Sequence, residues 1–226
     1  MDSIWTPSPN FNARQHPVTM LVLHYTGMQS GAEALARMTD AAAEVSAHYC
    51  VEEDGRVFHL VREDDRAWHA GQSRWRGLDD INSRSVGIEI VNPGHEWGYR
   101  PFPEAQMAAV LRLSADIVRT YGIAPRNVVR HSDIAPCRKQ DPGELFDWAC
   151  LARHGLAVAR PVKALTDPDW TDAGFMLALE RYGYDVEDGR AAITAFQRRF
   201  RPEWITGEID GECRAILMRL LLDNAA

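Results

Sequence analysis

The stretch HSDIAPCRKQDPG, residues 131–143, places His131 and Asp141 on one loop that proline and glycine punctuate. A short run rich in β-branched valine, residues 127–130, comes directly before it. This pattern predicts a strand that ends on His131 and a loop that brings back the carboxylate of Asp141, with Pro142-Gly143 fixing its turn. Neutral imidazole and carboxylate oxygen are both ordinary ligands of zinc. The stretch therefore predicts part of a divalent-metal site.

A second histidine lies in a matching context. The run MLVLHYTG, residues 20–27, is typical of an apolar strand and delivers His24. Two histidines and one carboxylate leave the fourth position of zinc to water, as in catalytic rather than structural sites. The pattern alone leaves alternatives open, since a histidine after a strand is more often a core or surface residue. Asp133 also competes with Asp141, although capping the loop or orienting a ligand histidine is its expected role.

The bulk composition is that of an ordinary globular protein. Of the 226 residues, 46% are hydrophobic and 25% are charged, and the formal net charge is -7. This charge argues against a general nucleic-acid binder, which carries a basic face. No apolar run approaches the roughly 18 residues of a membrane helix. Residues 1–15 lack the regions of a signal peptide, so we expect a cytoplasmic protein without membrane insertion.

The cysteines predict reduced thiols. Cys50, Cys137, Cys150 and Cys213 form no C-x-x-C pair. Cys50 and Cys213 stand in apolar patterns typical of small core residues. Cys137 lies in the metal loop, but a histidine and an aspartate already account for that loop, so we expect that Cys137 is not a ligand.

The expected elements alternate strands with helices. Asp54-Gly55 between two β-rich runs is a strong hairpin signal, and Pro103 and Gly122 bracket a long helix. A hairpin among crossover connections indicates an α/β fold with a mixed central sheet flanked by helices. Strands are expected at residues 18–25, 47–52, 56–62, 85–91 and 126–130, and helices at 31–43 (capped by Ser30), 103–120 and 144–153.

The end of the chain predicts a small three-helix domain. Residues 154–169 hold two prolines and show no periodicity, which is typical of a linker. Asp188 and Asp210 are good helix caps and Gly183 is a good stop. The expected helices span 171–182, 188–200 and 211–222, and the expected division is a main domain over 1–153, a linker over 154–169 and a helical domain over 170–226.

Five motifs together resemble one known family. LVLHYTG (21–27), VSAHYCVEEDGRVFHLV (45–61), AWHAG (67–71), SVGIEIVNPG (85–94) and HSDIAPCRKQDPG (131–143) look like zinc-dependent N-acetylmuramoyl-L-alanine amidases of the amidase_2 type. This group includes cytoplasmic anhydro-muropeptide amidases and shares its fold with phage T7 lysozyme and peptidoglycan recognition proteins. The resemblance covers roughly residues 15–150 and implies a catalytic main domain. The final residues resemble a small helical peptidoglycan-binding module, with a cap that only stabilises the main domain as the alternative.

The resemblance implies that His24, His131 and Asp141 bind Zn²⁺ and that Glu89 is the general base. Glu89 stands alone among apolar neighbours in SVGIEI. A buried carboxylate of this kind is paired, protonated or placed at a functional cleft. Burial raises a carboxyl pKa, which suits a general base. An ion pair with Arg84 on the strand face is the alternative.

Lys139 is the second catalytic residue that the resemblance implies. In the family, the lysine of the RKxDPG motif points at the site and stabilises the oxyanion, which is worth on the order of 10²–10³ in rate. The implied reaction is hydrolysis of the lactyl amide between N-acetylmuramic acid, possibly in its 1,6-anhydro form, and L-alanine. In this mechanism Glu89 takes a proton from the attacking water and hands it to the leaving amine.

Several other side chains stand in or near the motifs. His48 and His69 are expected at the cleft or behind the ligands rather than on the metal. Tyr25 and Trp68 either line the substrate groove or belong to the core, and Asn92 is a candidate donor to substrate. The remaining histidines have no context that separates them from surface residues, namely His16, His59, His95 and His154.

Proteins with two other functions carry similar motifs. A non-catalytic peptidoglycan recognition protein has the same fold, but such relatives commonly lose a zinc ligand, whereas this chain keeps all three together with Glu89 and Lys139. A phage-type lysin that cuts intact wall carries the same motifs. We expect peptidoglycan or its fragments as the partner. The absent leader favours soluble muropeptides recycled in the cytoplasm.

Overall fold

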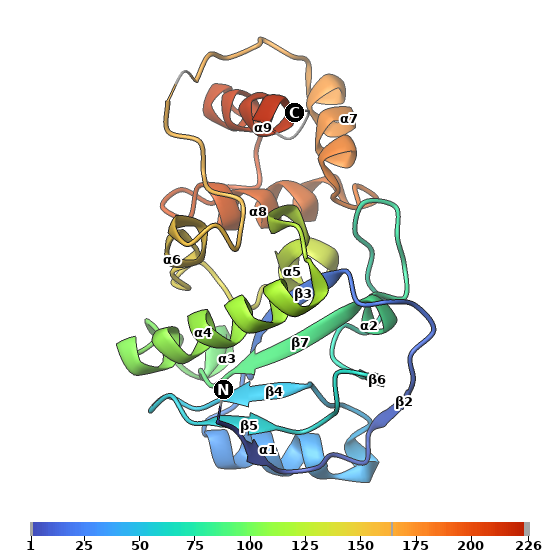
Figure 1. Cartoon of the computed structure of the whole chain (residues 1–226). Coiled ribbons are helices and arrows are strands. Elements are labelled where there is room, and N and C mark those ends of the chain that lie inside the picture. Colours follow the sequence, from blue (N-terminus) through green and yellow to red (C-terminus); the bar gives the residue numbers. More distant parts are fainter. Residues whose placement is uncertain (1, 164, 224–226) are drawn as a thin grey trace.

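A six-stranded mixed sheet forms the centre of the fold (Figure 1). In sheet order the strands are β1 (Ile4–Trp5), β5 (Val57–His59), β4 (Tyr49–Val51), β7 (Ser85–Ile90), β3 (Met20–Tyr25) and β8 (Val128–Arg130). Strand β5 pairs antiparallel with β4, and the other neighbours pair parallel. This computed structural model describes residues 2–163 and 165–223. The predicted mixed α/β fold is confirmed.

Helices pack on both faces of the sheet, and a small antiparallel pair joins β2 (Phe11–Ala13) to β6 (Asp65–Ala67). The α-helices are α1 (Gly31–Thr39), α2 (Ile81–Arg84), α3 (Gly94–Trp97), α4 (Glu104–Tyr121), α5 (His131–Ile134), α6 (Trp148–Arg153), α7 (Asp172–Tyr182), α8 (Gly189–Phe200) and α9 (Gly211–Asp223). Short 3-10 helices span Ala41–Ala43 and Pro125–Asn127.

Helix α1 is shorter than the predicted helix over 31–43. Ser30 caps it as expected, because its side chain accepts a hydrogen bond from Glu33 N. The helix ends at Thr39, since Asp40 takes an extended conformation and its side chain caps the 3-10 turn that follows.

The strand predicted over 126–130 ends at Arg130 as expected but begins only at Val128, after a 3-10 turn. His131 follows β8 directly, as predicted, and it is the first residue of the short helix α5, which was not predicted. The carboxylate of Asp133 stabilises the start of this helix, because it accepts a hydrogen bond from Arg130 N at 2.9 Å.

Alternation along β3 and β7 decides which side chains face the site. Leu21 and Leu23 on β3 and Ile88 on β7 share one hydrophobic cluster with residues of α4. His24 and Glu89 point to the opposite face, because successive side chains alternate along a strand. The parallel register pairs His24 with Glu89. The sheet thus places a predicted ligand and the predicted base side by side.

Of the C-terminal helices, α8 lies next to α5, and α7 and α9 pack together on the far side of α8 (Figure 1). The connection from α6 to α7 contains no helix or strand over the described residues 154–163 and 165–171. The hydrophobic core continues across this boundary, because Met20 and Val22 of β3 belong to one cluster with Phe175 of α7 and Phe196 of α8. Residues 164 and 224–226, within the predicted linker and helical domain, lie outside the described residues.

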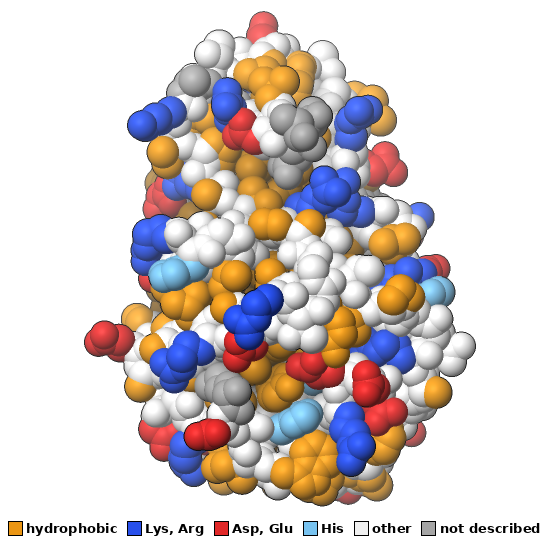
Figure 2. Space-filling model, viewed as in Figure 1, with side chains coloured by type: hydrophobic (Ala, Val, Ile, Leu, Met, Phe, Trp, Pro, Cys, Tyr) orange, Lys and Arg blue, Asp and Glu red, His pale blue; other side chains and the backbone are white. Residues whose placement is uncertain are grey.

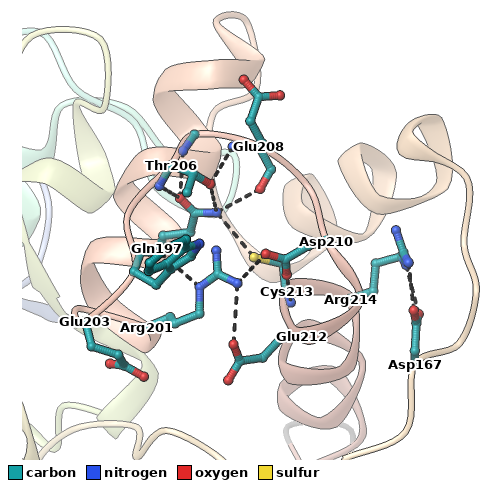
Figure 3. Close-up of polar contacts among 12 residues, drawn as sticks. Asp167, Gln197, Arg201, Glu203, Thr206, Glu208, Asp210, Glu212, Cys213 and Arg214 are labelled. Atoms are coloured by element: carbon teal, nitrogen blue, oxygen red, sulfur yellow. Dashed lines mark hydrogen bonds and ion pairs between the residues drawn. The ribbon is translucent and has the colours of Figure 1, made fainter.

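A polar network ties α8 to α9 and to the chain between them (Figure 3). Gln197 Nε2 donates to the carbonyl oxygen of Glu208 at 2.8 Å. Arg201, whose side chain is almost fully buried, pairs with Asp210 and Glu212. These partners all belong to the C-terminal helices and their connections, so the network stabilises that part of the molecule from within.

Acidic and basic side chains are interspersed on the face shown in Figure 2. On this face the acidic side chains therefore do not form one continuous patch. Among the described residues, no helix combines the length and the apolar character needed to cross a membrane.

Candidate metal centre

The three predicted ligands meet at one point. His24 comes from β3, His131 opens α5, and Asp141 lies on the loop after α5. The two Nδ1 atoms are 2.9 Å apart, and Asp141 Oδ2 lies 3.1 Å from His24 Nδ1 and 3.0 Å from His131 Nδ1. All three residues are buried. Tetrahedral zinc with ligands at about 2.0–2.1 Å needs ligand atoms roughly 3.3 Å apart, so this triangle has nearly the required size.

A chain of hydrogen bonds fixes the proton on the ring of His24. Ser85 Oγ donates to Ile81 O at 2.7 Å, so it accepts from His69 Nε2 at 3.3 Å. His69 Nδ1 then accepts from His24 Nε2 at 3.0 Å. This leaves His24 Nδ1 with a lone pair directed at the other two ligands. Metal-binding histidines usually donate from the second nitrogen in this way.

His131 is oriented in the same manner. Its Nε2 donates to Ala70 O at 3.1 Å, so its Nδ1 also carries a lone pair. Burial, followed by the neighbouring His131, lowers the pKa of His24 to about 4. His24 is therefore neutral near pH 7, as a metal ligand must be. Two lone pairs and the Asp141 carboxylate face one another at close range, which a cation between them would stabilise. The donor set fits a divalent metal.

The turn after Asp141 is held from several sides. Asp141 O accepts from Ser132 N at 3.1 Å, and Tyr99 Oη donates to Pro142 O at 2.8 Å. Gly143 has φ of +81°, and a Cβ there would lie 2.2 Å from Tyr99 Oη. Only glycine meets both conditions without strain. The expected Pro142-Gly143 turn is present and holds the Asp141 carboxylate toward the histidines.

Glu89 lies one strand away from His24 on the same face. Its side chain is half-buried, and Oε2 has no hydrogen-bond partner among the described residues. Burial, with added repulsion from Asp141, raises the pKa of Glu89 well above its usual value. The alternative partner, Arg84, donates from Nε to Asp79 O instead. An unpaired carboxyl group with a raised pKa has the properties of a general base.

Lys139 lies on the metal loop with its side chain half-buried. Its backbone N–H donates to Ala135 O at 3.0 Å. The positive charge of Lys139 lowers the pKa of both Glu89 and His24, although burial has the larger effect on each group. A cation that acts on both groups has the charge needed to stabilise a negative substrate oxygen.

Asp133, the competing carboxylate, does not join the cluster. Its Oδ2 accepts from Arg130 N and pairs with Arg199, and its Oδ1 accepts from Tyr184 Oη at 2.8 Å. The ring of His131 is oriented by a backbone carbonyl instead. Of the roles considered for Asp133, capping is therefore the one present, and the carboxylate also joins the metal loop to the C-terminal helices.

The other motif side chains support the fold around the site. His48 Nδ1 accepts from Gly87 N at 3.0 Å and so ties its loop to β7. Asn92 is buried and donates to Arg100 O at 2.7 Å, so its amide serves the fold rather than a substrate. Cys137 is exposed and lies outside the ligand cluster, as expected.

The burial of four further residues agrees with their sequence context. Trp68 is half-buried and donates from Nε1 to Asn12 Oδ1 at 2.8 Å. Cys50 and Cys213 are buried, in agreement with their apolar patterns. His154 is exposed.

His95 is the residue at the site that sequence analysis missed. Its ring stacks on Tyr99 with centroids 4.2 Å apart, and its Nδ1 lies 3.0 Å from Tyr25 Oη. Its Nε2 lies 3.1 Å from Glu144 Oε1, just beyond the turn that follows Asp141. The position of His95 in the sequence could have indicated this, because the segment NPGHEWGY comes shortly after β7. Functional sites often lie at the carboxyl ends of parallel strands.

The fold and the centre together define a class of enzyme. The N-acetylmuramoyl-L-alanine amidase family (Amidase_2) matches residues 14–144, and the chain belongs to this family. Membership confirms the predicted class, an amidohydrolase of muramoyl peptides, and favours catalysis over recognition alone.

Particular relatives extend the match beyond the catalytic region. The N-acetylmuramoyl-L-alanine amidase AmiD of Escherichia coli is 39% identical, and the match covers 90% of this chain and 82% of that protein. The 1,6-anhydro-N-acetylmuramyl-L-alanine amidase AmpD of the same organism is 35% identical, covering 63% of this chain and 86% of that protein.

Solved structures agree with this assignment. AmiD from E. coli in complex with the substrate anhydro-N-acetylmuramic acid-L-Ala-D-γ-Glu-L-Lys matches with a TM-score of 0.83 and 38% identity, covering 91% of this chain and 89% of that chain. AmpDh3 from Pseudomonas aeruginosa matches with a TM-score of 0.85 and 34% identity, covering 92% and 93%. Both matches span the C-terminal helices as well as the sheet.

Proposed function

We propose that this chain is a zinc enzyme that hydrolyses the amide between N-acetylmuramic acid and L-alanine in muropeptides, including those with a 1,6-anhydro sugar. The proposed ligands are His24, His131 and Asp141. The observation that carries the proposal is the convergence of two imidazole lone pairs and one carboxylate oxygen within 3.1 Å of one another. The anhydro-muramoyl peptide bound to AmiD supports the substrate class.

The protein side chains have separate roles in this reaction. When bound, zinc supplies Lewis acidity toward the amide carbonyl and lowers the pKa of water. Glu89 accepts a proton as the water oxygen adds to the carbonyl carbon. Lys139 stabilises the negative charge that develops on the carbonyl oxygen. As the C–N bond breaks, Glu89 returns the proton to the L-alanine nitrogen, so atoms and charges balance.

The substrate and the role of the C-terminal helices are further parts of the proposal. Soluble anhydro-muropeptides are the proposed substrates because relatives that match the catalytic region are named for them. The division into residues 1–153, 154–169 and 170–226 stays a prediction, as do peptidoglycan binding by the helices and a cytoplasmic role in recycling. The hydrophobic cluster shared with β3 favours a stabilising role for these helices.

Product analysis tests the proposal. The full chain would be incubated with a 1,6-anhydro-muropeptide and with intact sacculi, each with and without a chelator, and products would be identified by mass spectrometry. We expect release of free stem peptide that the chelator abolishes and added zinc restores. Faster release from the soluble fragment would support recycling, and faster release from sacculi would support wall cleavage. Zinc binding without cleavage of either substrate would contradict the enzymatic proposal.

A further inference from the structure

The C-terminal helices reach directly into the metal loop. Arg199 of α8 forms an ion pair with Asp133 in which both side chains are 0% exposed. The same guanidinium donates from Nη2 to Val128 O at 3.1 Å. Val128 lies on β8 and Asp133 on α5, so one side chain of α8 holds the segments immediately before and after His131.

A second arginine makes the reverse connection. Arg130, which directly precedes His131, donates from Nη1 to Arg198 O on α8 at 2.7 Å. It also donates to Gly143 O at 3.2 Å, at the far end of the metal loop. The indole of Trp148 is contacted by the guanidinium groups of Arg130 and Arg199, at 5.1 Å and 4.6 Å from its ring. The backbone on both sides of His131 is therefore anchored to one turn of α8.

We propose that Arg199 is a positioning residue of the metal centre: through Asp133 and Val128 it fixes the backbone on both sides of His131, and so the place from which the His131 ring reaches Ala70 O and the other two ligands. The C-terminal helices would then be part of the metal site, whether or not they also bind peptidoglycan. The inference rests on the proposed zinc ligands. Its physical basis is that groups behind the first ligands orient them, and their loss typically weakens metal binding about 10-fold to 100-fold.

A merely structural ion pair would stabilise α8 without affecting the metal. Arg201 provides the matched control, because it lies two residues further along the chain and its side chain is equally buried. Arg201 pairs with Asp210 and Glu212 and donates to Trp204 O, all within the C-terminal part (Figure 3). The same substitution at the two positions removes one buried guanidinium that contacts the metal loop, that of Arg199, and one that does not, that of Arg201.

The experiment compares Arg199→Lys with Arg201→Lys in the full chain. Zinc affinity would be measured by competition with a chromophoric chelator, and ligand geometry by the visible absorption of the Co²⁺-substituted protein. We expect Arg199→Lys to weaken zinc binding about 10-fold or more and to shift the Co²⁺ bands. We expect Arg201→Lys to lower the thermal midpoint while zinc affinity and the Co²⁺ spectrum stay at wild-type values.

Tyr184→Phe provides a second variant if Arg199→Lys does not fold. It removes only the hydrogen bond to Asp133 Oδ1 and keeps the ring, so we expect weaker zinc binding in a folded chain. Wild-type zinc affinity in the linked variants, or equal losses at Arg199 and Arg201, would overturn the inference. A wild-type chain that binds no zinc would contradict the proposed metal centre itself, and this inference with it.

Discussion

At the scale of single residues, the metal centre depends on which nitrogen of each histidine carries the proton. His24 donates from Nε2 to His69, and His131 donates from Nε2 to a backbone carbonyl. Both Nδ1 atoms are thereby left as acceptors. A free imidazole can hold its proton on either nitrogen, so these partners prepare the site for a metal before it binds.

Replacing His69 by leucine tests whether the hydrogen bond to His24 Nε2 is needed for zinc binding. The His69→Leu variant removes the acceptor for His24 Nε2, and we expect zinc affinity to fall about 10-fold to 100-fold. Competition with a chelator would measure it. His59→Leu is the control, because His59 contacts Val61 O away from the centre. Equal losses in the two variants would show that the hydrogen bond to His24 has no special role.

Glu89→Gln separates catalysis from metal binding. Glutamine has nearly the same shape but cannot accept the proton from water, so we expect the rate of peptide release to fall about 10²-fold to 10⁴-fold. Bound zinc, measured by elemental analysis, is expected to stay at the wild-type level. Glu53→Gln is the control, because Glu53 is a partly exposed carboxylate that pairs with Arg100 and takes no part in the ligand cluster. A Glu89→Gln variant with the wild-type rate would refute the role of general base.

The proposed metal ligands and the place of His69 behind them were expected from the motifs, but the particular hydrogen-bond partners of the supporting residues were not. His24, His131 and Asp141 follow strand and turn patterns that identify them one by one. His69 is 45 residues from His24 in the chain, and His95 is 49 residues from Glu144. These pairings form only through the tertiary fold, so no local pattern shows which atom contacts which.

At the scale of elements, strand β7 serves both the core and the site. Ile88 packs toward α4, whereas Gly87 and Glu89 lie on the face of the metal centre. Gly87 is required there because the His69 ring lies directly against it. A Cβ on Gly87 would approach ring atoms of His69 to 2.5–2.6 Å.

Gly87→Ala is therefore expected to displace the His69 ring. The paired strand backbone has little freedom to move, so we expect both a lower thermal midpoint and weaker zinc binding, measured by thermal unfolding and chelator competition. Gly174→Ala in α7 is the control, since a Cβ there comes no closer than 3.4 Å and alanine favours a helix. Unchanged zinc affinity in Gly87→Ala would show that the ring can relax without affecting His24.

Length decided which elements the sequence could predict. Helix α4 and the helices α7 to α9 are long, carry clear caps and begin and end close to the predicted residues. Helices α2, α3 and α5 have four residues each, and β1 has two. These are too short for a periodic pattern and depend on tertiary contacts. The predicted helix over 144–153 begins only at Trp148, where Asp147 caps it.

At the scale of the whole molecule, the sheet and the C-terminal helices share one core. Met20, Trp75 and Ile134 pack in the same cluster as Phe175 and Phe196. Burial of one such side chain contributes about 1.5–3 kcal/mol, against a typical total stability of about 5–15 kcal/mol. The sequence predicted the helices from their own periodicity, but periodicity does not show what an apolar helix face will contact.

A chain that ends at residue 153 tests this shared core. Truncation would expose apolar residues of β3 and α5, so we expect a much lower thermal midpoint and increased binding of a hydrophobic dye. Arg201→Lys in the full chain is the control, because it perturbs the same helices without removing them. Cooperative unfolding of the truncated chain at the wild-type midpoint would contradict a shared core and support separate domains.

We propose that one metal ion, held by His24, His131 and Asp141, makes this chain an active amidase. The most direct measurement is the rate of stem-peptide release from a 1,6-anhydro-muropeptide as zinc is added stepwise to metal-free protein. We expect activity to rise in proportion to added zinc and to saturate at one equivalent per chain. Full activity in the metal-free protein, or stoichiometric zinc binding without activity, would contradict it.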